Sequence, residues 1–215
     1  MGRNHPIDAV VSFQAELRAG WGMRRQTIKE KLGSRLCVWI DPSTVLDDIA
    51  SKYPVTHPMF SLSKIVPVAS RLERVAKGLE PFLIPNFVFR KRRPIVSIPK
   101  FERVRNLVSC GEHYKESIWY NHLLRRLKDN GVVRYKKRKI ESVNDLDMFF
   151  ETGPMDLMRS MAEHGYIVGK ARDFGSGFVD RHGSIVKGYS GNHRFYMAKC
   201  LGLKRYPIEI GGINW

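Results

Sequence analysis

The sequence has little cysteine and no long apolar run. Cys37, Cys110 and Cys200 are too few and too scattered for a disulfide framework or a zinc site. No apolar stretch approaches the roughly 18 residues that a membrane-spanning helix needs. The first residues lack the apolar core of a signal peptide, and Pro6 stands where N-myristoylation requires Ser or Thr. We therefore expect a cytoplasmic protein with no transmembrane segment.

Acidic residues are also scarce. The sequence has 21 Asp and Glu against 37 Lys and Arg, which gives a formal net charge of +16. Such an excess attracts nucleic acids, nucleotides, acidic polymers or anionic lipid surfaces without selecting among them. One dense basic run is most often a solvated face, but this chain has two, which makes nucleic acid a possible partner. The residues of these runs are Arg90, Lys91, Arg92 and Arg93, and then Arg134, Lys136, Lys137, Arg138 and Lys139.

The first half of the chain predicts short elements. With 43% hydrophobic residues, 215 residues can bury one good core or two modest ones. The pattern predicts helices over residues 6–19 and 23–32, a buried strand over 36–40, and a further short helix capped by Asp41. Frequent prolines then divide residues 54–99 into short pieces.

The second half predicts longer elements. Apolar spacing favours a helix over residues 112–129, and the run 132–140 is typical of a basic strand. Another helix should start at Thr152 and carry Met155, Met158, Met161 and Ala162 on one stripe. We interpret that stripe as core, because methionine commonly fills gaps between packed elements.

These patterns divide the chain near residues 104–110, where a strongly periodic helix begins and leads directly into the basic strand. Residues 1–105 would form a mainly helical N-terminal extension of unknown function. Residues 106–215 would form an α/β (α+β) domain with a small mixed sheet and packed helices.

The most informative stretch is residues 185–210, which predicts a strand, a glycine turn, a helix and a second strand. Two glycines follow the β-branched run, at points where the backbone must turn sharply. Asn192 is a favoured N-cap, and Gly202 is placed to end the helix in a left-handed conformation. The alternation over residues 206–210 is typical of an edge strand that returns to the sheet.

The start of this helix is a candidate anion site. Its free amides and the positive end of its dipole suit a phosphate, and Arg194 adds a planar fork that can hold two oxygens. His193 can donate one more hydrogen bond. Spacing alone leaves open the alternative of an ordinary solvated helix start. The residues expected to bind phosphate are Ser190, Gly191, Asn192, His193 and Arg194.

This stretch resembles the ParB/sulfiredoxin superfamily. Its members carry a strand, a Gly-x-His-Arg or Gly-x-Arg-Arg turn, a helix that ends in Leu-Gly, and a short strand. The matching residues are Gly191, His193, Arg194, Ala198, Leu201, Gly202 and Pro207 to Ile210. The resemblance covers about residues 166–210. It implies a small α/β domain whose turn and helix start hold the phosphates of a nucleotide, for peptide-sulfur repair, nucleotide switching on DNA, DNA cleavage or phosphorylation of a small metabolite.

Three departures narrow this range. Asn192 stands where sulfiredoxins have the reacting cysteine, so we do not expect sulfiredoxin chemistry. The sequence stops at Trp215, where partition proteins continue into a helix-turn-helix region, so we do not expect a partition protein. Ser190 stands where serine-kinase-like members have an acidic residue, so a catalytic base would have to come from elsewhere.

Residues 173–178 offer a second glycine-rich segment near the turn. Their Asp-Phe-Gly triplet occurs in protein kinases, but the remaining kinase motifs are missing. We interpret the segment as a loop between two strands. It would either line the nucleotide site through Ser176 or be only a flexible hairpin.

Few residues are suited to acid–base chemistry at such a site. Asp180 precedes a predicted turn and could face the same pocket as Gly191. Glu112 and Glu116 would share one helix face by i,i+4 spacing, where they could bind a metal, although a charged helix surface is the commoner outcome. The candidate catalytic residues are Asp180, Glu112 and His193, with Glu116 and Asp173 as further options.

Two functions follow from these observations. The first is an enzyme that binds ATP or CTP with Mg²⁺ at residues 190–194 and transfers or hydrolyses the terminal phosphate. The second is a basic DNA- or RNA-binding protein, or a ParB-like nuclease, that holds the nucleic-acid backbone with its two basic runs. A noncatalytic partner of an acidic polymer or a membrane surface is a third possibility.

Overall fold

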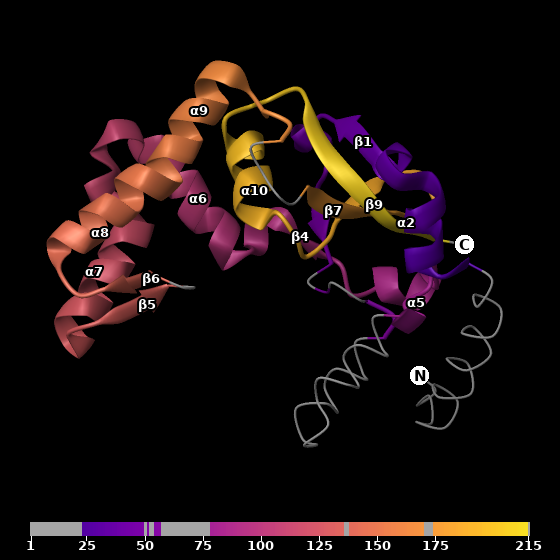
Figure 1. The fold of residues 1–215 in the computed structure, drawn as a ribbon, viewed down its shortest axis with the longest axis horizontal. Coiled ribbons are helices and arrows are strands. Elements are labelled where there is room, and N and C mark those ends of the chain that lie inside the picture. Colours follow the sequence, from indigo (N-terminus) through magenta and orange to yellow (C-terminus); the bar gives the residue numbers. More distant parts are fainter. Residues whose placement is uncertain are drawn as a thin grey trace.

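The computed structural model describes residues 23–49, 51, 54–56, 78–135, 138–169 and 174–214. It is a mixed α/β protein, as predicted, with one seven-stranded mixed sheet and a separate two-stranded sheet. Figure 1 shows the large sheet on one side, α7, α8 and α9 on the other, and α6 and α10 between them. The predicted helix over 6–19 lies outside the described residues.

The strands of the large sheet follow the order β1-β9-β7-β8-β2-β4, and β3 pairs with the end of β9. They are β1 (Cys37–Ile40), β2 (Asp47–Asp48), β3 (Leu83–Ile84), β4 (Arg93–Pro94), β7 (Gly175–Val179), β8 (Ile185–Lys187) and β9 (Tyr206–Asn214). β9 runs antiparallel to β1 and parallel to β7. The sheet therefore joins strands from both sides of the predicted boundary, which falls inside α6 (Pro99–Cys110).

Two predictions about these strands are wrong. β9 is not an edge strand, because it lies between β1 and β7 and continues beyond the five alternating residues to Asn214. The segment Gly175–Val179 is a strand rather than a loop. Its glycines are needed because neighbouring side chains lie against them: a Cβ on Gly177 would approach Ile208 Cγ2 to 2.7 Å. The predicted strand over 36–40 is confirmed, but it is an edge strand that is only partly buried.

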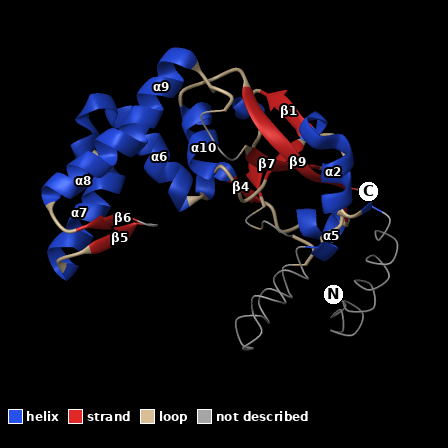
Figure 2. Cartoon of the chain, viewed as in Figure 1, coloured by secondary structure: helices blue, strands red, loops and turns tan. Residues whose placement is uncertain are grey.

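The helices are shown in blue in Figure 2. They are α2 (Arg25–Leu32), α5 (Asn86–Phe89), α6, α7 (Ile118–Asn130), α8 (Val143–Phe150), α9 (Asp156–His164) and α10 (Asn192–Cys200). Short 3-10 segments cover Gly33–Leu36, Pro42–Thr44, Ile95–Ser97 and Gly111–Glu116. The helix predicted over 23–32 is confirmed by α2. The helix predicted after Asp41 is wrong, because Pro42–Thr44 forms a single 3-10 turn and the chain then enters β2.

The second half also differs from its predicted boundaries. The helix predicted over 112–129 starts later, because His113 leaves helical geometry and the Ser117 hydroxyl caps α7 by accepting a hydrogen bond from Tyr120 N at 3.2 Å. The single strand predicted over 132–140 is a hairpin of β5 (Val133–Tyr135) and β6 (Arg138–Ile140). The helix expected to start at Thr152 continues α8 through a π-helical turn, Glu151–Met155, into α9.

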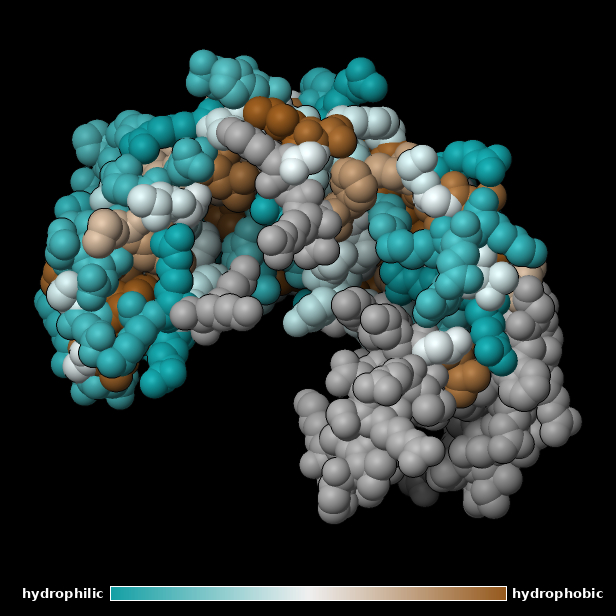
Figure 3. Space-filling view, in the orientation of Figure 1, coloured by the Kyte–Doolittle hydropathy of each residue, from teal (hydrophilic) through white to brown (hydrophobic). Residues whose placement is uncertain are grey.

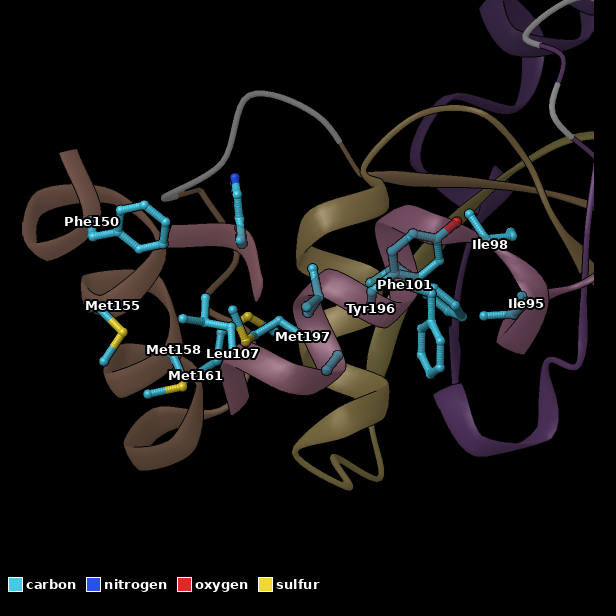
Figure 4. Close-up of a cluster of buried hydrophobic side chains, with 14 of the residues drawn as sticks. Ile95, Ile98, Phe101, Leu107, Phe150, Met155, Met158, Met161, Tyr196 and Met197 are labelled. Atoms are coloured by element: carbon cyan, nitrogen blue, oxygen red, sulfur yellow. The ribbon is translucent and has the colours of Figure 1, made fainter. Parts of the chain in front are cut away.

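The main core lies where α6 packs against α10 and the α8–α9 segment. Figure 4 shows methionines of the α8–α9 segment beside Leu107 of α6 and Met197 of α10. Met155, Met158 and Met161 are buried, which confirms their prediction as core, whereas Ala162 is exposed. Hydrophilic side chains cover most of the described surface in Figure 3. None of the helices placed by the structure is long and apolar enough to cross a membrane.

Candidate functional site

The glycine turn between β8 and α10 lies tightly against β7. Gly191 has φ +69°, and a Cβ there would come within 2.7 Å of Gly175 Cα. A Cβ on Gly188 would come within 2.5 Å of Ser176 Oγ. Glycine is therefore required at residue 191 both by backbone conformation and by close approach to the neighbouring strand.

Ser176 and Ser190, which the sequence predicted at the phosphate site, instead hold this turn through hydrogen bonds to the backbone. Ser190 N donates to Ser176 Oγ at 3.1 Å, and Ser190 Oγ donates to Phe174 O at 3.4 Å. Ser176 is buried within β7. Neither hydroxyl lines the cleft described below, so their direct role is to fix the turn.

Lys187 holds the turn from inside the protein. Its side chain is fully buried, and Nζ donates to Gly188 O at 2.6 Å, to Ser190 O at 2.5 Å and to Asn192 Oδ1 at 2.9 Å. Because Asn192 uses its side chain here, it is not the N-cap that the sequence predicted. Gly191 occupies that position instead. Burial lowers the pKa of Lys187 to about 7, and the nearby Asp48 carboxylate opposes this shift.

Asp48 is the buried acidic neighbour of Lys187. The two residues are paired in register between the parallel strands β2 and β8. Asp48 accepts long hydrogen bonds of 3.5 Å from Tyr196 Oη and from Arg93 Nη2. Burial raises the pKa of the Asp48 carboxyl, although Lys187 and Arg93 act in the opposite direction. This group links β2, β4 and α10 beneath the turn.

The start of α10 opens into a cleft of about 670 Å³. The first amides of a helix have no acceptor within the helix itself, so they are available to a ligand. The walls come from α6, α7, the β5–β6 hairpin, α8, the π-helical turn and α9. The lining residues are Val104, Trp119, Tyr135, Arg138, Phe149, Gly153, Pro154, Leu157, Gly191, Asn192, His193, Arg194 and Met197.

His193 is fixed in the wall of this cleft. Its imidazole stacks on the Trp119 ring with centroids 5.3 Å apart and planes at 14°. His193 Nε2 lies 3.3 Å from Tyr135 Oη. Burial raises the pKa of Tyr135, and its hydroxyl and His193 Nε2 lie within hydrogen-bonding distance of each other. His193 therefore forms part of the cleft wall and can also offer a hydrogen-bond donor to a ligand.

Two arginines make the cleft electropositive. Arg194 stands on the first turn of α10 and is partly buried. Arg138 of the hairpin donates to Thr152 Oγ1 at 3.1 Å and lies 5.9 Å from the Phe149 ring centroid. Among the described residues, no Asp or Glu lines the cleft. The partly buried Arg194 and the exposed Arg138 share this cavity with no carboxylate among its described lining residues, which favours an anionic ligand.

Asp180 lies away from this cleft. It occupies the turn between β7 and β8, at the end of β8 opposite the glycine turn. Its carboxylate accepts from His182 N and Ser184 N, both at 2.9 Å, and from Arg92 Nη1 at 3.3 Å. Burial opposes the charged form, but these donors outweigh it and lower the pKa of Asp180. The carboxylate is thus engaged in holding a turn.

Glu112 also lies apart from the α10 cleft, on the exposed 3-10 segment before α7. Arg159 Nε donates to its Oε1 at 3.0 Å, and Arg159 Nη2 to its Oε2 at 2.5 Å. The irregular backbone at His113 removes the helix face that Glu112 and Glu116 were predicted to share. Where the structure places side chains, no three His, Cys, Asp or Glu residues gather as metal ligands. Asp173 lies outside the described residues.

The residues of the two basic runs differ in their contacts. In the first, Arg92 pairs with Asp47 and Asp180, both at 3.3 Å, and Arg93 pairs with Asp48 at 3.5 Å. Arg90 and Lys91 are exposed. In the second run, Lys139 pairs with Glu141 at 2.7 Å, Arg134 is exposed, and Arg138 lines the cleft. Lys136 and Lys137 belong to the part of the chain that is not described.

Sequence reasoning missed the aromatic wall of the site. Trp119, Tyr135 and Phe149 come from α7, the hairpin and α8, so no local motif connects them. Tyr135 inside the second basic run was the one available signal, since aromatic residues among cations are typical of nucleic-acid sites. No protein-family model, curated protein or solved structure matches this chain.

Proposed function

We propose that this protein binds a nucleotide, with a phosphate at the start of α10. One observation carries the proposal: Arg194 and His193 of the first helical turn open into a cleft that contains aromatic rings and, among its described lining residues, no carboxylate. Helix starts favour phosphate through free amides and the helix dipole. The resemblance to the ParB/sulfiredoxin superfamily, carried by the same residues, supports the same ligand class.

The size and chemistry of the cleft support a nucleotide rather than a bare anion. Its volume of about 670 Å³ lies in the range of roughly 300–1,000 Å³ that is typical of small-molecule sites. Tyr135, Phe149 and Leu157 provide apolar surface for a base, while Arg194 and Arg138 provide charge for phosphates. A nucleotide has the same division between a flat apolar part and an anionic part.

We propose nucleotide binding alone, without phosphoryl transfer. Transfer or hydrolysis with Mg²⁺ would require a carboxylate near the terminal phosphate. Asp180 and Glu112 are held elsewhere by their own partners. The described lining therefore fits the phosphates of ATP or CTP but supplies no acidic group to coordinate a metal or accept a proton.

Isothermal titration with ATP, CTP and GTP tests this proposal. We expect at least one nucleotide to bind, and we expect Arg194→Gln to weaken it about ten- to hundredfold, the loss typical of one charge-assisted hydrogen bond. Arg125→Gln is the matched control, because Arg125 is exposed on α7 and does not line the cleft. No binding of any nucleotide, or equal affinities for the two variants, would contradict the proposal.

A further inference from the structure

A second, smaller cavity shares aromatic lining residues with the cleft. Its volume is about 30 Å³, and its lining residues are Lys100, Arg103, Val104, Trp119, Tyr135 and His193. Val104, Trp119, Tyr135 and His193 also line the larger cleft. Each of the two cavities therefore has two cations in its lining, and the rings of Trp119, His193 and Tyr135 are common to both.

The cations of the small cavity come from the beginning of α6. Lys100 is exposed and Arg103 is partly buried. Within the described residues, neither forms an ion pair with a carboxylate, whereas Arg105 on the same helix pairs with Glu102 at 2.5 Å. Lys100 is also close enough to Lys187 to disfavour the charged form of that buried lysine. Cations of α6 and β8 therefore lie near one another here, and a local excess of positive charge attracts anions.

Two separated groups of cations restrict the ligand. In a mononucleotide, all phosphates lie at one end of the molecule. In a nucleic-acid strand, a phosphate stands on each side of every nucleoside, and an unpaired base can lie against aromatic rings between them. Arg194 and Arg138 in the lining of the cleft, and Lys100 and Arg103 in the lining of the smaller cavity, match the second arrangement.

We infer that the site takes single-stranded nucleic acid, with one phosphate at the start of α10 and a neighbouring phosphate at Lys100 and Arg103. This inference rests on the proposed function, because it assumes the first phosphate position and adds a second. The base between the two phosphates lies against the aromatic wall. Duplex is disfavoured, since its bases are stacked and paired and cannot enter the cleft.

The test compares a short ligand with a long one. Binding of CTP is measured by calorimetry, and binding of a labelled ten-nucleotide oligodeoxycytidylate by fluorescence anisotropy over a salt series. The double variant Lys100→Gln with Arg103→Gln is expected to lose about tenfold or more in oligonucleotide affinity. Its log–log salt slope should become shallower by about 0.7, the value for the loss of one single-strand phosphate contact. Its CTP affinity should stay unchanged.

The control is Arg125→Gln with Lys128→Gln, which removes the same charge from the exposed surface of α7. An equal loss of oligonucleotide affinity in this control would overturn the inference, since it would show only nonspecific attraction. Equal loss of CTP and oligonucleotide affinity in the Lys100 and Arg103 variant would also overturn it, because these cations would then contact the same phosphate as the start of α10. Failure of the proposed function is distinct: wild-type protein would bind none of ATP, CTP and GTP.

Discussion

At the scale of single residues, Gly191 is the position on which the site depends most. It combines a left-handed backbone with direct approach to β7, so the turn can neither relax nor move away. Gly183, in the turn between β7 and β8, has a similar φ of +80°, but a Cβ there would meet open space. At Gly183 a substitution would therefore meet only the unfavourable backbone conformation, whereas at Gly191 it would also meet a steric contact.

Replacement of these glycines by alanine should have unequal effects. Gly183→Ala is expected to lower the free energy of unfolding by about 1–2 kcal/mol, the cost of placing Cβ in the left-handed region. Gly191→Ala should cost distinctly more, because the new methyl group also displaces the Gly175 backbone. Chemical denaturation of both variants measures the difference. Equal losses would mean that the turn is not held against β7.

The sequence anticipated the residues of the site unevenly. Gly191, His193 and Arg194 were predicted because a glycine, a helix start and a cation are adjacent in sequence, and the structure places all three in the cleft lining. The side chains of Ser176 and Ser190 support the turn instead, which depends on contacts between strands. Tertiary packing sets the direction in which these serine side chains point, so the local sequence pattern does not predict it.

At the scale of elements, Lys187 connects the end of β8 to the start of α10. All three of its hydrogen bonds go to the turn and to Asn192, and the Phe195 ring lies 5.5 Å from Nζ. A buried ammonium group is costly, and here the cost is offset by hydrogen bonds to three oxygen atoms, Gly188 O, Ser190 O and Asn192 Oδ1. The strand and the helix are therefore joined by one side chain.

This lysine should give the protein a recognisable pH dependence. Its pKa is about 7 in the folded protein against an ordinary value of 10.5, so between these values the unfolded chain binds more protons. Stability contributed at this position therefore rises with pH, by up to about 1.4 kcal/mol per pH unit. Urea denaturation from pH 6.5 to 8.5 should show this rise in wild type relative to Lys187→Met. Parallel curves for the two proteins would contradict the shift.

Element prediction succeeded where the signal was local. The strand ending at Lys187, the helix to Cys200 and the strand from Tyr206 follow from periodicity and glycine position. β7 was missed because its glycines resemble a loop, although they serve close packing. β2 and β4 are two residues long and arise from pairing with each other and with β8, so the chain on either side of them carries no strand pattern.

At the scale of the whole molecule, the sheet ties together segments that the sequence appeared to separate. β1 and β2 from the first quarter of the chain pair with β9 and β8 near its end. The cleft then lies between this sheet-associated turn and the helices α6 to α9. The fold class was accessible from sequence, and so were Gly191, His193 and Arg194 of the cleft lining, whereas the aromatic wall required three distant elements to be brought together.

The structure divides the cations that give the net charge of +16 into two groups. Arg92, Arg93 and Arg159 are used in ion pairs within the protein. Arg194, Arg138, Lys100 and Arg103 line two connected cavities without a carboxylate among the described lining residues. The second group is therefore the part of the charge that we assign to a ligand.

The most direct test of this account is a crystal structure of the protein with bound CTP. We predict phosphate density within hydrogen-bonding distance of the Arg194 guanidinium and the first backbone amides of α10, with the base beside Tyr135 and Phe149. A nucleotide bound elsewhere, or a phosphate turned away from the start of α10, would contradict the central claim.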